Sequence, residues 1–211
     1  MHIRRTANAG VLIELDQTTV LLDGVCKSCS PYYGTTEAEK ESLLACAPDI
    51  TAFTHGHLDH FDREFACKLY NRTLRPILGP EGLLKQGCIC EPVRVGAVTV
   101  TPIPSRHIGK AGQGVAHVSY LVEGSVRILF AGDAAPTQLR GQTADILIAP
   151  YAWVLSPEAW RLASEIAPNF ILVHMPQPEA DTMGLWSVVD TLTAQPGAKI
   201  YIPRLGETIH I

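Results

Sequence analysis

The chain has 211 residues, 46% of them hydrophobic and 18% charged, a composition that excludes a disordered protein. With 17 Lys and Arg residues, 21 Asp and Glu residues and eight neutral histidines, the formal net charge is −4, which argues against nucleic acids and anionic membranes as partners. No apolar run approaches the roughly 20 residues needed to cross a bilayer, and the length suits a single domain over residues 1–211.

The first half of the chain is predicted to alternate strands with helices. Apolar and β-branched residues flank Asp16-Gln17-Thr18, a spacing that predicts an antiparallel hairpin. Thr36, with Glu39 three residues later, resembles a capping box, so a helix is expected to begin there. In order, the expected elements are hairpin strands at 10–15 and 19–23, a helix at 36–46, a buried strand at 50–53 and a helix at 62–71.

The second half repeats this plan in outline. An apolar run at 98–103 precedes a second hairpin, which is expected around Glu123-Gly124-Ser125. The other expected elements are hairpin strands at 117–122 and 126–130, strands at 145–149, 170–173 and 199–202, and helices at 157–166 and 185–192. Strands that alternate with helices in this way predict a layered α/β domain.

The segment 54–60 carries the strongest chemical signal of the sequence. Three imidazoles and a carboxylate fall within six residues, directly after the strand expected at 50–53; they are His55, His57, Asp59 and His60. Neutral imidazole and carboxylate are ligands that borderline divalent ions accept, and an irregular loop can direct them to different points. Gly56 is expected to relieve crowding in a tight turn. The alternative interpretation is a solvated polar loop.

Three further candidate ligands stand just beyond the ends of apolar runs, as the first motif does. They are His107, Asp133 and His174. A sheet that delivers side chains from several strand ends can gather them at one rim, and seven ligands suit two ions better than one tetrahedral ion. His117 is the rival of His107, but it begins a predicted strand, where a core or surface imidazole is the simpler explanation.

These seven residues, with Asp133 inside Ala131-Gly132-Asp133, resemble the ligand pattern of the metallo-β-lactamase superfamily. The opening NAGVLIE at 8–14 and the ending PRLGETI at 203–209 are most similar to its short branch related to L-ascorbate-6-phosphate lactonase. The resemblance implies a four-layer αβ/βα sandwich, with two internal sheets, helices outside and the metals at one edge.

The resemblance also implies a role for each ligand. The first ion would be held by His55, His57 and His107. The second would be held by Asp59, His60 and His174, with Asp133 bridging the two. Zinc is the usual metal of the superfamily, while manganese occurs in the lactonase branch and iron in the redox members.

Two such ions predict hydrolysis, because a bound ion can lower the pKa of water to about 7 and so supply hydroxide at neutral pH. The predicted function is a binuclear metal-dependent hydrolase that uses a metal-bridging hydroxide on an ester, lactone, amide or phosphoester of a small molecule. Asp59 is expected to orient the hydroxide and to pass a proton to the leaving group. A non-catalytic metal-binding sensor and a di-iron redox protein are the alternatives.

Four residues around the ligands are further candidates. Asp23, at the end of a hairpin strand, is expected to accept the second N–H of a ligand histidine, or else to be a simple turn residue. Arg106 and Lys110 lie in a glycine-rich loop beside His107 and are predicted to hold an anionic substrate, unless the loop is only a charged surface. Tyr151 follows a predicted strand and is expected to line the pocket, although such aromatic residues often cap a core.

The six cysteines suit a reducing compartment, and no export signal is recognisable, so a cytoplasmic location is expected. The pairs Cys26/Cys29 and Cys88/Cys90 are left open between metal ligands, disulfides and free thiols, while Cys46 and Cys67 are predicted to be buried on helices. The expected partner is a small-molecule substrate, and a homo-oligomer is compatible with the sequence.

Overall fold

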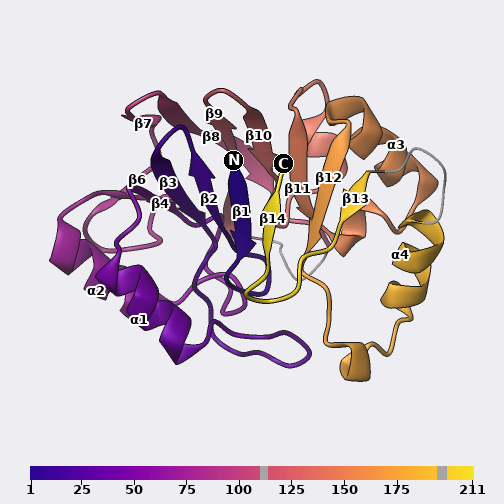
Figure 1. Cartoon of the computed structure of the whole chain (residues 1–211), viewed down its shortest axis with the longest axis horizontal. Helices are drawn as coiled ribbons and strands as arrows, with labels where there is room; N and C mark the ends of the chain where they lie inside the picture. The colour runs from indigo at the N-terminus through magenta and orange to yellow at the C-terminus, as the bar shows by residue number, and fades with distance from the viewer. Residues whose placement is uncertain (110–113, 194–198) are drawn as a thin grey trace.

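The computed structural model describes residues 1–109, 114–193 and 199–211, which form two facing β-sheets with helices on their outer sides (Figure 1). The helices α1 (Glu37–Ala45) and α2 (Arg63–Thr73) cover the first sheet, and α3 (Pro157–Ile166) and α4 (Leu185–Thr193) cover the second. This arrangement is the four-layer αβ/βα sandwich of the α/β class that the sequence predicts.

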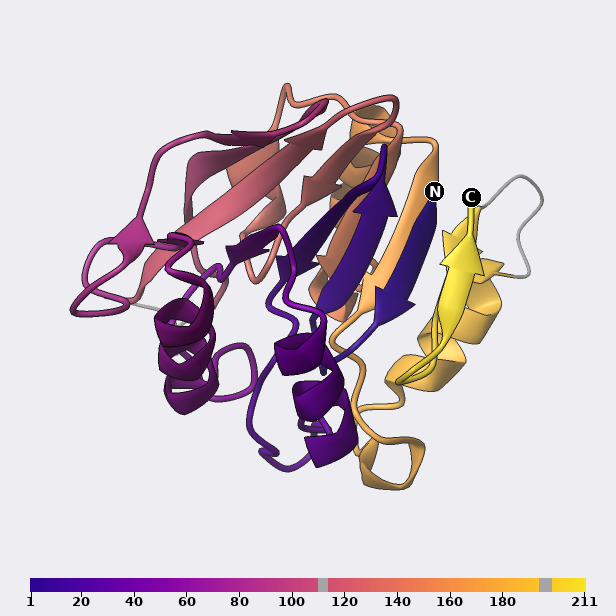
Figure 2. The same cartoon turned by 60° about the vertical axis from the view of Figure 1, so that its left-hand side comes forward.

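The first sheet has seven described strands, antiparallel on one side and parallel on the other. Their order is β14 (Thr208–His210), β1 (His2–Arg5), β2 (Val11–Leu15), β3 (Thr18–Leu22), β4 (Ile50–Ala52), β5 (Ile77–Leu78) and β6 (Cys88–Ile89). β2 and β3 are the predicted hairpin, and its two-residue turn places Asp16 and Gln17 at positive φ, the geometry that matches strand twist. β1 and β14 join the two ends of the chain (Figure 2).

The second sheet mirrors this plan in the described residues. Its order is β13 (Ile200–Tyr201), β12 (Asn169–Val173), β11 (Ile146–Pro150), β10 (Arg127–Phe130), β9 (Ala116–Glu123), β8 (Val98–Arg106) and β7 (Val93–Val95). β10, β11 and β12 are parallel, and β8 runs in the same direction because both it and β10 are antiparallel to β9. The strands that precede the candidate ligands of this sheet therefore end at the same edge.

The main core lies between the sheets and follows the alternation of the strands. Val11, Ile13 and Leu15 of β2 are buried there, while Glu14 between them is exposed. Two outer layers of apolar side chains lie under the helices, with Leu43, Phe65 and Leu69 under α1 and α2. Ser156 caps α3 by accepting from the backbone N–H of Ala159.

The predicted helices and the longer strands are confirmed, whereas five short strands had no prediction. These are β1, β5, β6, β7 and β14, each of four residues or fewer. The Thr36 hydroxyl caps α1 by accepting from the Glu39 N–H at 3.2 Å. The capping box is incomplete, because the Glu39 carboxylate pairs with Arg4 of β1 instead of returning to the cap.

The prediction of buried helical cysteines is wrong. Cys67 is exposed because Phe65, Ala66 and Leu69 form the inner face of α2, and Cys46 is exposed at the end of α1. All six cysteines are free thiols, and the groups of described side chains with metal-ligand spacing contain no cysteine. None of the described helices combines the length and apolar character needed to span a membrane.

Candidate metal centre

The candidate ligands lie on loops that leave the strands at one edge of the sandwich. Cross-sheet hydrogen bonds position the first loop, since the Tyr120 hydroxyl donates to the carbonyl of Phe53 at 2.8 Å and the Val118 N–H donates to Thr54 at 3.0 Å. His107 is held to the loop after β10 by a bridge to Ala134. The two sheets thus bring their ligand loops together.

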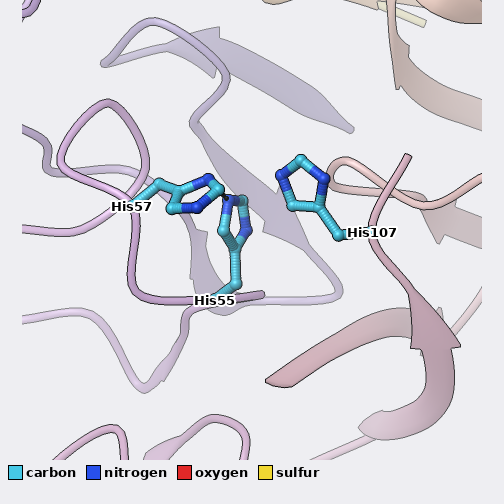
Figure 3. A group of neighbouring side chains, drawn as sticks. All are labelled: His55, His57 and His107. Atoms are coloured by element: carbon cyan, nitrogen blue, oxygen red, sulfur yellow. Dashed lines mark hydrogen bonds between the residues drawn. The ribbon is translucent and has the colours of Figure 1, made fainter. Parts of the chain in front are cut away.

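The first ligand group consists of His55, His57 and His107, whose ligand atoms all lie within 4.8 Å of one another. Figure 3 shows the three rings converging from two separate segments. His55 is fully buried, and its Nδ1 lies 2.9 Å from the Thr54 hydroxyl, so its Nε2 faces the group. Burial lowers the pKa of both His55 and His57, which favours the neutral imidazole that binds metal ions.

The second group consists of Asp59, His60 and His174, and their ligand atoms also lie within 4.8 Å of one another. Nε2 of His174 lies 3.1 Å from Oδ2 of Asp59. His174 is in the left-handed region at φ 58°, and its N–H donates to the carbonyl of Asn8 at 3.1 Å. Non-glycine residues adopt this conformation infrequently, and here the contact with Asn8 holds it.

Asp133 lies between the two groups. Its carboxylate is 3.4 Å from Nε2 of His60, 3.4 Å from Nε2 of His107 and 3.7 Å from Nε2 of His174. Burial acts to raise the pKa of Asp133, but His60 and His174 hold it well below its usual range, so the group is a carboxylate. Asp133 therefore occupies the position from which one side chain reaches both groups.

Asp23 contacts both His60 of the second group and Thr54 of the first ligand loop. Its fully buried carboxylate accepts from the N–H of Thr54 at 2.7 Å and from the Thr54 hydroxyl at 2.6 Å. Its Oδ2 also lies 2.8 Å from Nδ1 of His60. This contact orients the imidazole and directs its other nitrogen, Nε2, toward Asp133. Asp23 thus lies where the sequence places a support for a ligand histidine.

The chemistry of the site fits divalent metal ions. Nε2 of His60, Nε2 of His107 and Oδ1 of Asp133 are buried and have no hydrogen-bond partner among the described residues. An unsatisfied buried polar atom costs about 1–3 kcal/mol, so three that face one centre need a common partner. Imidazole nitrogens and carboxylate oxygens are the donors that zinc, manganese and iron accept.

Gly132, rather than Gly56, is the glycine that the site needs. Gly132 has φ 54°, and a Cβ there would lie 2.5 Å from the Thr54 side chain. Gly56 is exposed, and a Cβ there would meet only Leu83 at an ordinary 3.6 Å. The expectation that Gly56 relieves crowding is therefore wrong, and the close approach occurs where the Gly-Asp pair meets the first loop.

The three residues predicted to contact substrate differ in their distance from the ligand groups and in whether the structure describes them. Tyr151, in the short helix η2 (Tyr151–Trp153), has its ring centroid 6.0 Å from that of His174. Arg106, at the end of β8, is exposed, and Lys110 lies outside the described residues.

Tyr32 was not anticipated, because its loop carries no recognisable motif. Its ring meets His174 edge-on, with centroids 4.4 Å apart. Burial raises the pKa of Tyr32, and a hydrogen bond to Tyr151 adds to this rise. The phenol therefore stays protonated beside the second ligand group.

His117 is buried close to the first group without belonging to it. Its ring centroid lies 5.2 Å from that of His55, and its Nδ1 lies 2.8 Å from the Ser105 hydroxyl. Burial lowers the pKa of His117 to about 3, so the ring is neutral. Three groups of described residues have metal-ligand spacing, the third being Asp23, His55 and His60; none includes His117, whereas His107 belongs to the first.

Solved structures identify the fold. Neither a protein-family model nor a curated protein sequence matches the chain. A possible metal-dependent hydrolase from Veillonella parvula superposes with a TM-score of 0.72 at 17% identity, covering 100% of this chain and 98% of its own. An isothiocyanate hydrolase from Delia radicum gut bacteria gives a TM-score of 0.69 at 16% identity, covering 100% and 99%.

A third similar structure is described by its fold. The metallo-β-lactamase fold protein YhfI from Bacillus subtilis superposes with a TM-score of 0.63 at 16% identity, covering 99% of this chain and 98% of its own. The described residues therefore have the metallo-β-lactamase fold. The similarity to the branch related to L-ascorbate-6-phosphate lactonase stays a prediction.

Proposed function

We propose that the chain is a binuclear metal-dependent hydrolase that acts on an ester, lactone, amide or phosphoester bond of a small molecule. The observation that carries this proposal is the convergence of two three-ligand groups on one buried carboxylate, Asp133. The fold shared with metal-dependent hydrolases supports it further. Zinc is the metal we expect first, since imidazole and carboxylate ligands suit it.

The first group would hold one ion and the second group the other, with Asp133 shared between them. When bound, the ions would supply a hydroxide nucleophile at neutral pH and polarise the carbonyl or phosphoryl oxygen under attack. Asp59 would accept the proton and pass it to the leaving group. Burial acts to raise the pKa of Asp59, but its contact with His174 lowers it, so a carboxylate is available as proton acceptor.

Tyr32 and Tyr151 would bind the substrate beside the second group. Both rings flank His174, and the protonated Tyr32 hydroxyl is a hydrogen-bond donor. Arg106 is exposed at the end of β8, where it would attract an anionic substrate from solvent. Leu58, within the first loop, is exposed and would offer apolar contact.

Metal analysis combined with hydrolysis assays would test this proposal. The purified protein is assayed for bound metal, then for hydrolysis of a panel of phosphoesters, lactones, carboxylic esters and an isothiocyanate. We expect two equivalents of metal, activity that chelation removes, and recovery with zinc, manganese or iron. Metal-loaded protein that is inactive on the whole panel would support the sensor instead, and reversible iron redox chemistry would support the di-iron protein.

A further inference from the structure

A cavity is lined by residues that follow Tyr32 and His174 in the chain. Its volume is about 690 Å³, within the range of small-molecule sites. Its described lining residues are Arg5, Tyr33, Met175, Pro176, Pro178, Trp186, Ile202, Pro203, Arg204 and Leu205, none of which is a proposed metal ligand. Met175 directly follows His174, and Tyr33 directly follows Tyr32, so two chain segments that surround the second ligand group continue into the lining of this cavity.

The walls suit an aromatic ring. The Trp186 indole is fixed, because its Nε1–H donates to the carbonyl of Pro176 at 3.1 Å. Tyr33 is anchored by its hydroxyl, which donates to Glu179 at 3.4 Å, and Met175 is only 1% exposed. Rigid aromatic faces together with a polarisable thioether favour planar aromatic ligands over flexible polar ones.

Arg5 places a buried positive charge in the same wall. The residue is 4% exposed, and its guanidinium donates to the carbonyl oxygens of Ala7, Pro203 and Asn8 at 3.1, 3.1 and 2.8 Å. It has no carboxylate partner among the described residues. Burial lowers the pKa of Arg5 to about 10, which still leaves it cationic at neutral pH. Buried charges are normally paired, and three carbonyl contacts leave two of the five N–H groups available.

Arg204 adds a second positive charge beside the cavity. Its side chain is exposed and forms no salt bridge with a described residue. The nearby Glu207 carboxylate accepts from the backbone N–H of Arg204 at 2.7 Å. The lining thus contains two guanidinium groups and no carboxylate, which favours an anionic ligand.

We propose that this cavity binds an aromatic carboxylate, with its ring against Trp186 and Met175 and its carboxylate on Arg5 and Arg204. The site goes beyond the proposed hydrolase, because it uses none of the metal ligands. Its occupancy is therefore expected to be independent of metal loading.

Calorimetric titration of the purified full-length protein with 2-naphthoate tests the site. The neutral analogue 2-naphthalenemethanol has the same ring system without the charge. We expect one equivalent of 2-naphthoate to bind, at least about tenfold more tightly than the alcohol, because a charge-assisted contact is lost in the alcohol. Equal affinity for the two compounds would overturn the assignment to the arginines.

Substitutions of cavity residues test where 2-naphthoate binds. Leu205→Trp fills the cavity and is expected to abolish binding, whereas Leu155→Trp, on an exposed leucine outside the cavity, is the matched control. Arg204→Gln is expected to weaken binding about two- to fivefold, the range of an exposed ion pair.

Asp133→Asn separates this site from the metal centre. The variant is expected to lose metal and to keep 2-naphthoate binding, so its result for the cavity does not depend on the hydrolase proposal. Loss of naphthoate binding in folded Asp133→Asn protein, or full binding by Leu205→Trp, would overturn the proposal. Far-ultraviolet circular dichroism verifies that each variant is folded.

Discussion

The two ligand groups differ in the kind of partner that orients their histidine rings. In the second group, Nδ1 of His60 lies 2.8 Å from the Asp23 carboxylate, while Nε2 of His174 faces Asp59, itself a candidate ligand, at 3.1 Å. In the first group, Nε2 of His55 lies 3.0 Å from Nδ1 of His57, so two ring nitrogens face each other. On the nitrogens that face away from the ligand groups, Nδ1 of His55 contacts the Thr54 hydroxyl at 2.9 Å and Nδ1 of His107 contacts the Ile108 carbonyl at 2.7 Å. The rings of the first group are therefore oriented by neutral partners, whereas His60 of the second group is oriented by a charged one, which makes the stronger contact.

The largest expected effect comes from the residue that the two groups share. Asp133→Ala removes the carboxylate that contacts His60, His107 and His174, so loading with two equivalents of metal should be abolished. Elemental analysis of the purified variant measures this directly. Retention of two equivalents would contradict the position of Asp133 between the groups.

Removing a ligand from one group should cause the loss of one metal ion. His107→Ala removes a ligand of the first group, so we expect one equivalent to be lost while the second group keeps its own. His117→Gln is the matched control, because His117 is also buried near His55 but belongs to neither group. Metal titration followed by elemental analysis distinguishes the two variants. If only the His117→Gln variant lost an equivalent, His117 rather than His107 would be the ligand of the first group.

The contribution of preorganisation can be measured at Asp23. Asp23→Asn keeps the shape but removes the charge that faces His60, and we expect metal affinity to fall about 10- to 100-fold. Asp49→Asn is the matched control, because Asp49 also accepts from the N–H and hydroxyl of one threonine, Thr19. Competition with a chelator of known affinity gives both values, and equal affinities would remove the distinction between the groups.

The smallest expected effect concerns the loops that carry the ligands. Gly132→Ala should lower the free energy of unfolding by more than about 1 kcal/mol, because φ is positive and Thr54 lies too close. Gly56→Ala should change it by less than about 0.5 kcal/mol, because the added methyl group has room. Urea unfolding of the metal-free variants provides the comparison, and the reverse ranking would contradict it.

Much of the fold could be predicted because its signals are local. The Thr36 cap, the hairpin turn at Asp16 and the apolar spacing around Phe65 each act within a few residues. The candidate ligands were recognisable for a similar reason, since each motif that contains them follows an apolar run that forms a strand. The short strands gave no such signal, because β5 and β6 have only two residues each and depend on their neighbours for pairing.

The sequence by itself determined which side chains can bind metal and roughly where each strand begins and ends, because hydrophobic periodicity and capping depend on adjacent residues. The tertiary structure alone decided that β1 pairs with β14, that Tyr32 lies against His174, and that Arg5 and Trp186 line one cavity. These contacts join residues far apart in the chain. They result from the packing of two sheets against each other, for which a single sequence contains no local pattern.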